Sequence, residues 1–177
     1  MQPVPDTKDW TWVLRERCPQ CGFDSRSPQR SDLAALCREV GDQWEAALSV
    51  NAAPRQRPAP QVWSPLEYGC HVRDVFDLFD VRMRLMLAED GASFANWDQD
   101  ETAIAEDYAG QDPQVVSAEL GRSADGYASV LDGLAPAQWE RSGSRDGGAT
   151  FTVDSLTRYL LHDAIHHLVD VTGRPWS

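Results

Sequence analysis

The sequence has few basic residues relative to its acidic ones, and lysine is nearly absent. It contains 16 lysines and arginines against 28 aspartates and glutamates, which gives a formal net charge of -12. Lys8 is the only lysine. A nucleic-acid-binding surface needs a basic patch that displaces counterions from phosphates. The composition therefore argues against nucleic acid as a partner, and the preference for arginine over lysine is typical of a GC-rich bacterial genome.

Long apolar runs are also missing. No segment approaches the roughly 18 apolar residues of a membrane-spanning helix, and the start, MQPVPDTKDW, has no basic residues followed by an apolar stretch. We therefore expect a cytoplasmic protein without a membrane partner. Cysteine is scarce too, since four cysteines in 177 residues do not make the dense disulfide framework of a small secreted protein.

Apolar residues at spacings of three and four do occur, and they mark four helical segments. The segments run over residues 31–48, 64–88, 112–134 and 152–173. No run of alternating residues predicts a sheet, and the long connection 91–111 is of a length that is often functional and can hold a short helix. We predict an all-α fold, a four-helix bundle domain at 31–177 preceded by an irregular arm at 1–30.

The arm contains the sequence Cys18-Pro-Gln-Cys21-Gly22, which has the shape of a turn that presents two thiolates to zinc. A strong zinc signal needs a second pair of ligands, and a redox motif needs a strand before it and a helix after it. Three interpretations of Cys18 and Cys21 stay open. They are a structural metal site completed by other residues, a reversible dithiol, or two thiols without a special role.

The four histidines are unevenly distributed, because three of them fall in LHDAIHH at residues 161–167. His162 and His166 are four residues apart, so on a helix they stack one turn apart, ~6 Å, where two imidazoles can share one ion. His71 lies on the second segment, and facing helices of a bundle deliver side chains to a common inward site. We predict a divalent metal site of His71, His162 and His166. Three imidazoles suit Zn, Ni, Fe or Co, with Zn or Ni expected, and leave one position open.

Several further polar residues are candidates for supporting roles. His167 is about 100° around the helix from His166, so it is a boundary residue, a group that supports a metal ligand, or a group that contacts the substrate. Asp74 and Asp163 are placed to orient an imidazole by accepting its distal proton. Asp98 and Asp100, in the long connection, either close over the open coordination position, contact a substrate amine or hydroxyl, or cap the loop.

Together, His71 within EYGCHVRD and the downstream His162-x-x-x-His166-His167 resemble the DinB/YfiT-like family. The resemblance covers residues 31–173 and rests on the combination of helix order, the capped second segment and the histidine pair on the last one. Members are four-helix bundles with a three-histidine metal site, and His71, His162 and His166 are the matching positions. Many members depend on a thiol, including mycothiol-dependent maleylpyruvate isomerase and S-transferases of low-molecular-weight thiols.

This resemblance implies a metal-dependent transferase that activates a low-molecular-weight thiol, such as mycothiol, for conjugation to an electrophile. The expected partners are that thiol, the electrophile and a second copy of the chain, because four-helix members often pair. The alternative is a non-catalytic metal-binding stress-response bundle. The arm with Cys18 and Cys21 is not part of the family pattern, and the isomerase members are longer by a C-terminal domain, so isomerase activity is not implied.

Overall fold

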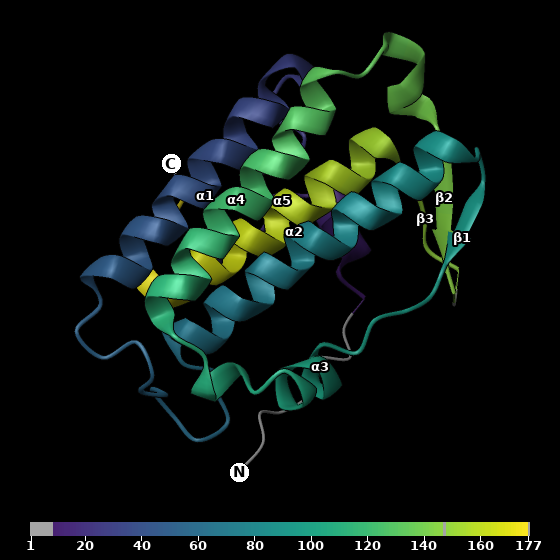
Figure 1. Ribbon diagram of the computed structural model, residues 1–177. Coiled ribbons are helices and arrows are strands. Elements are labelled where there is room, and N and C mark those ends of the chain that lie inside the picture. The colour runs from purple at the N-terminus through teal and green to yellow at the C-terminus, as the bar shows by residue number, and fades with distance from the viewer. Residues whose placement is uncertain (1–8, 147, 177) are drawn as a thin grey trace.

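Four long helices form the body of the protein (Figure 1). The computed structural model describes residues 9–146 and 148–176, so residues 1–8 of the predicted arm, Gly147 and Ser177 lie outside the described residues. The helices are α1 (Leu33–Val50), α2 (Pro65–Ala88), α4 (Pro113–Asp132) and α5 (Val153–Thr172). Each bound lies within two residues of its predicted position. The predicted four-helix fold is confirmed.

The helices are not arranged around the bundle in chain order. α4 packs against both α1 and α2, and α5 packs against the same two helices. The order around the bundle is therefore α1, α4, α2, α5, which places α1 and α2 diagonally across the core. Trp44 of α1 is fully buried there, and its indole Nε1 donates to the carbonyl of Ala164 on α5 at 3.0 Å. None of the described helices has the length and apolarity to span a membrane.

Capping explains why α2 begins where the sequence predicts. The Ser64 side chain accepts from the backbone N–H of Glu67, and the Glu67 carboxylate accepts from the N–H of Ser64 at 2.8 Å. This reciprocal pair satisfies two amides that have no partner within the helix. Arg57, from the linker before the helix, also donates to the Glu67 carboxylate. The side chains of α2 are thus fixed in register from the first turn.

A small sheet at one end of the bundle was not predicted (Figure 1). Its strands are β1 (Ala92–Phe94), β2 (Ser142–Arg145) and β3 (Thr150–Thr152), with β1 parallel and β3 antiparallel to β2. Strands of three or four residues are too short to give an alternating pattern, and the β1–β2 pairing joins distant parts of the chain. The connection after β1 does hold a short helix, α3 (Gln99–Ala105), as expected.

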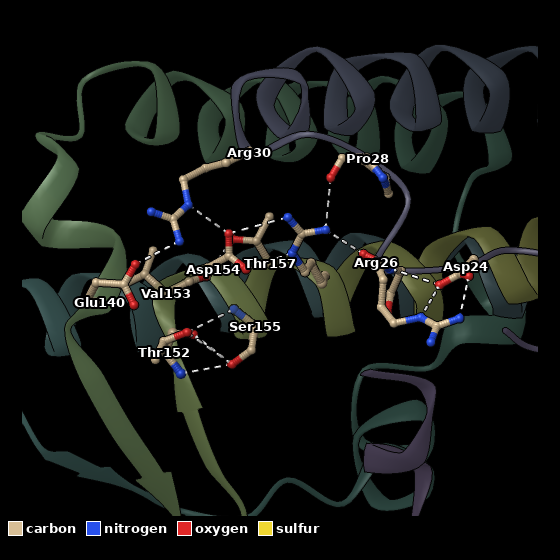
Figure 2. Close-up of polar contacts among 12 residues, drawn as sticks. Asp24, Arg26, Pro28, Arg30, Glu140, Thr152, Val153, Asp154, Ser155 and Thr157 are labelled. Atoms are coloured by element: carbon tan, nitrogen blue, oxygen red, sulfur yellow. Dashed lines mark hydrogen bonds and ion pairs between the residues drawn. The ribbon is translucent and has the colours of Figure 1, made fainter. Parts of the chain in front are cut away.

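From residue 9 onward the arm packs along α5. Arg158 of α5 donates to the backbone carbonyls of Ser25 and Pro28. Arg30 pairs with Asp154 in the first turn of α5, as Figure 2 shows. Buried arm residues are Val13, Cys18, Cys21, Phe23 and Ser25. Arm and bundle therefore share one core, and the boundary at residue 30 stays a prediction.

Candidate functional site

Side chains that can bind a metal gather in two clusters, and α5 contributes to both. The first, called the His71 cluster, consists of His71, Asp163 and His167. The second, called the Cys18 cluster, consists of Cys18, Cys21, His162 and His166. Within each cluster, one ligating atom from every residue lies within 4.8 Å of the others. The described structure thus presents two groups of ligands where the sequence predicted one.

The three histidines predicted to share an ion do not form a single group. His71 lies with Asp163 and His167, whereas His162 and His166 lie with the arm cysteines. The physical reason is helix geometry, because consecutive residues project about 100° apart. On α5 the pair at 163 and 167 faces α2, and the pair one residue earlier faces the arm.

In the His71 cluster, one oxygen of Asp163 faces both imidazoles. Asp163 Oδ1 is 3.2 Å from Nε2 of His71 and 4.0 Å from Nε2 of His167. An ion with tetrahedral bonds of 2.0–2.2 Å needs donor atoms about 3.4 Å apart. The two distances bracket that value, so these residues fit a single divalent ion.

Neighbouring side chains fix the orientation of His167. Its Nδ1 lies 3.1 Å from a carboxylate oxygen of Asp170, and the ring of Tyr68 stacks on it with centroids 4.8 Å apart. A proton on Nδ1, donated to Asp170, leaves the Nε2 lone pair directed at Asp163. Histidines that bind metals usually have such a carboxylate on the distal nitrogen.

The electrostatics of the His71 cluster keep its carboxylate charged. Burial opposes ionisation of Asp163, but the charge and hydrogen bond of His71 outweigh this, and the pKa of Asp163 falls well below 3.8. His71 is buried with only 1% of its surface exposed, and its Nδ1 has no hydrogen-bond partner among the described residues. The cluster therefore combines an anionic oxygen with an imidazole that is incompletely satisfied by the chain.

Two tryptophans enclose the His71 ring. Trp97, from the long connection before α3, stacks parallel to it with centroids 5.4 Å apart and an interplanar angle of 5°. Trp63, just before α2, lies at the same centroid distance, tilted by 50°. Asp163 and His167 are more exposed, at 28% and 20% of their side chains. Aromatic rings thus surround His71, and the more exposed side chains of the cluster are those from α5.

The remaining predicted residues have local roles in the structure. Asp74, one turn after His71, accepts hydrogen bonds from the Tyr108 hydroxyl and from Arg73. Asp98 is the N-cap of α3 and accepts from the backbone N–H groups of the next turn, so the loop-capping alternative describes it. Asp100 is half-buried in that first turn.

The arm cysteines lie against the helix at the second cluster. Cys18 and Cys21 are both free thiols and fully buried. Cys18 Sγ lies 3.7 Å from Nδ1 of His166. His162 is buried beside them, and burial lowers its pKa to about 4, so its imidazole is neutral at pH 7.

Comparison with known proteins identifies the family of the bundle. The sequence pattern of the DinB superfamily matches residues 43–170, well over half of the chain. The chain belongs to the DinB superfamily. The match includes the His71 cluster, His162 and His166, but it excludes Cys18 and Cys21. The two thiols therefore lie outside the matched region.

The fold is similar to that of YfiT from Bacillus subtilis. YfiT is described as a probable metal-dependent hydrolase with an unusual four-helix bundle topology. The TM-score is 0.73 at 20% sequence identity, over 84% of this chain and 89% of YfiT. No curated protein matches the sequence. At this identity the likeness establishes a shared fold.

The sequence analysis treats Asp163 as a residue that orients an imidazole and not as a candidate ligand, although the sequence contains a signal for that role. LHDAIHH contains two interleaved pairs with the same spacing, one at 162 and 166 and the other at 163 and 167. Carboxylate oxygens bind zinc as well as imidazole nitrogens do in known catalytic sites, so the pair at 163 and 167 is also a candidate. The metal site predicted from the sequence uses only the pair made of two histidines, His162 and His166.

Proposed function

We propose that the chain is a metal-dependent enzyme whose ion is held by His71, Asp163 and His167. The observation that carries the proposal is the convergence of two imidazoles and one carboxylate between α2 and α5. Such a donor set occurs in catalytic zinc sites, and three protein donors leave a position for a substrate. Zinc or nickel is the expected ion. This set takes the place of the three histidines predicted from the sequence.

The proposed reaction is transfer of a low-molecular-weight thiol, mycothiol in the first instance, to an electrophile. A divalent ion at this site would lower the pKa of such a thiol and so supply the reactive thiolate at neutral pH. The choice of a thiol over water rests on the resemblance to thiol-dependent members of the family. Water is the competing nucleophile, because YfiT is described as a probable hydrolase.

The chain's own residues support this chemistry in separable ways. Asp163 supplies the negative charge that favours a cation, and Asp170 orients His167. Trp97 and Trp63 shield His71 from water and offer an aromatic surface on which an apolar electrophile can rest.

The test is conjugation of mycothiol to a bimane or a haloarene by the full chain, loaded with Zn²⁺ or Ni²⁺ or stripped of metal. We expect turnover only in the loaded protein, and a loss of at least about 100-fold for His71→Ala, Asp163→Ala and His167→Ala. Asp132→Ala, which removes an exposed acid at the end of α4, is the matched control and should keep full activity.

Each other outcome contradicts a stated part of the proposal. Undiminished transfer by metal-free protein would exclude the metal-dependent step. Metal-dependent ester hydrolysis without any thiol would replace the thiol by water. Stoichiometric metal at the three residues with no turnover of either kind would favour a non-catalytic metal-binding bundle.

A further inference from the structure

The Cys18 cluster lies outside the site just described and has no part in the proposed reaction. Two of its residues come from the arm turn and two from successive turns of α5. Their ligating atoms lie within 4.8 Å of one another although the pairs are more than 140 residues apart in the chain. Two sulfurs and two imidazole nitrogens are the donor set of a structural zinc site.

We propose that Cys18, Cys21, His162 and His166 bind one Zn²⁺ ion that fastens the N-terminal arm to α5. This ion is separate from the one proposed for the His71 cluster. Its role is structural, because four protein ligands complete a tetrahedral shell and leave no position for a substrate.

The spacing of the ligand atoms fits a tetrahedral ion. Zinc bonds of about 2.3 Å to sulfur and 2.0–2.1 Å to nitrogen require an S···N separation of about 3.6 Å. Cys18 Sγ and His166 Nδ1 are 3.7 Å apart. As a hydrogen bond this contact is weak, because a thiol is a poor donor. The separation fits two ligands around a common centre.

A buried nitrogen supplies an independent observation. His162 is 4% exposed, and its Nε2 has no hydrogen-bond partner among the described residues. An unpaired buried polar atom destabilises the fold, because it loses its hydrogen bonds to water without replacing them. A zinc ion at the centre of the cluster would use this lone pair and remove that cost.

The arm turn is shaped to present its two sulfurs. The N–H of Gly22 donates to the Cys18 carbonyl at 2.9 Å, and Gly22 adopts the left-handed region at φ 81°. The N–H of Cys18 in turn donates to the Phe23 carbonyl at 2.9 Å. Both sulfurs are thereby held on the same side of the turn, facing α5.

Charge balance also suits a divalent ion. Two thiolates and two neutral imidazoles carry a total charge of -2, which one Zn²⁺ ion neutralises. Cysteine binds a metal as the thiolate, so binding releases thiol protons to solvent and leaves a buried site with no net charge.

Both ends of the described chain meet at this cluster, so an ion here would hold two terminal segments against α5. Trp10 covers the imidazoles of His162 and His166, with ring centroids 5.7 and 5.2 Å away. Near the other end, the N–H of Trp176 donates to the Cys21 carbonyl at 3.0 Å. The ion would therefore tie the arm, α5 and the C-terminal segment into one unit.

The direct test replaces zinc by Co²⁺ in the full wild-type chain and records its absorption spectrum. We expect thiolate-to-cobalt charge-transfer bands and the intense ligand-field bands of a tetrahedral ion. X-ray absorption of the zinc form should give sulfur neighbours at about 2.3 Å. Spectra without any sulfur contribution would overturn the proposal, and this measurement needs no variant to fold.

Variants then assign the signal to residues. Cys18→Ser with Cys21→Ser should lose one zinc per chain and all thiolate–cobalt absorption. Cys37→Ala with Cys70→Ala, which alters the two buried cysteines outside the cluster, should lose neither. His71→Ala with His167→Ala should keep the sulfur signal and lose only the other ion, so failure of this proposal is distinguishable from failure of the proposed function.

Two results would contradict the proposal at this stage. Retention of both ions in the Cys18→Ser, Cys21→Ser variant would show that the sulfurs are not ligands. Isolation of the wild type with a Cys18–Cys21 disulfide that refuses zinc after reduction would assign the pair to a dithiol. Limited proteolysis tests whether the ion fastens the arm to α5. After chelation, we expect the protease to cleave the arm earlier in the digestion than it cleaves α5.

Discussion

A displacement of one residue along α5 separates the two metal clusters. His162 and His166 form one pair at helical spacing, and Asp163 and His167 form another, turned by about 100°. The sequence contains both pairs and predicts that the two members of each pair lie one turn apart. The sequence does not show which pair faces α2, because the rotation of α5 about its own axis depends on its packing against α1 and α2. The assignment of partners to His71 therefore needed the structure.

Asp170 provides a prediction about the support of the His71 cluster. It lies 3.1 Å from Nδ1 of His167 but 3.8 Å from Nε2 of His166, beyond hydrogen-bond distance. Loss of a carboxylate behind a metal-bound histidine typically weakens affinity 10–100-fold. Asp170→Asn should weaken zinc binding by about this factor at the His71 cluster and less at the Cys18 cluster.

A competition titration with a chromogenic chelator measures both affinities of the Asp170→Asn chain. Asp132→Asn serves as the matched control, because Asp132 pairs with Arg38 on another face of the bundle. Equal weakening of both sites, or of neither, would mean that Asp170 does not act through His167.

Glu67 gives a prediction about pH. Burial opposes its ionisation, but hydrogen bonds from Arg57 and Ser64 outweigh this and lower its pKa. A carboxyl with a lowered pKa stabilises the fold above its unfolded value, about 4.3, and this contribution disappears as the pH falls through the folded pKa. Glu67→Gln should lower the free energy of unfolding by about 1.5–3 kcal/mol at pH 7, and by less below about pH 4.

Urea denaturation of the wild type and of Glu67→Gln at both pH values measures this difference. Glu39→Gln, on an exposed face of α1, should change little at either pH. A wild-type advantage that grows toward acid would contradict the assigned direction of the pKa shift.

At the scale of elements, the sequence predicted what is encoded locally. Ser64 with Glu67 and the left-handed Gly173 mark the start of α2 and the end of α5 within one residue. The three-stranded sheet was not predicted because β1 pairs with β2, and the two strands are separated in the sequence by α3 and α4. Short strands carry too little periodicity to be predicted, and their partners are fixed only by the tertiary fold.

Gly173 and Gly126 both have open surroundings but differ in backbone conformation, so replacing each by alanine should have opposite effects on stability. Gly173 ends α5 at φ 67°, and a Cβ added there would meet no atom within 4 Å, so Gly173→Ala tests backbone strain alone. It should destabilise the fold by about 1–2 kcal/mol. Gly126 lies inside α4 with equally open surroundings, and Gly126→Ala should stabilise by about 0.5–1 kcal/mol. Urea midpoints of opposite sign check the pair, and equal shifts would contradict it.

For the whole molecule, we expect the four-helix body to stay folded without metal. The four helices share a buried apolar core that includes Trp44, Phe76, Tyr127 and Leu160. Metal removal should therefore leave the helical circular dichroism intact at 25 °C. An ion present at about 100 times its dissociation constant stabilises by about 2.7 kcal/mol, which in a domain of this size corresponds to a fall in Tm of about 5–10 °C for each ion that chelation removes. Collapse of the helical signal on chelation would make the ions essential to the fold.

Two interleaved metal sites on α5 are the central claim about this molecule, and anomalous diffraction at the zinc edge from crystals of the zinc-loaded chain tests it most directly. We predict two anomalous peaks. One lies among Cys18, Cys21, His162 and His166, and the other among His71, Asp163 and His167. A single peak shared by His71, His162 and His166 would contradict the account and restore the site predicted from the sequence alone.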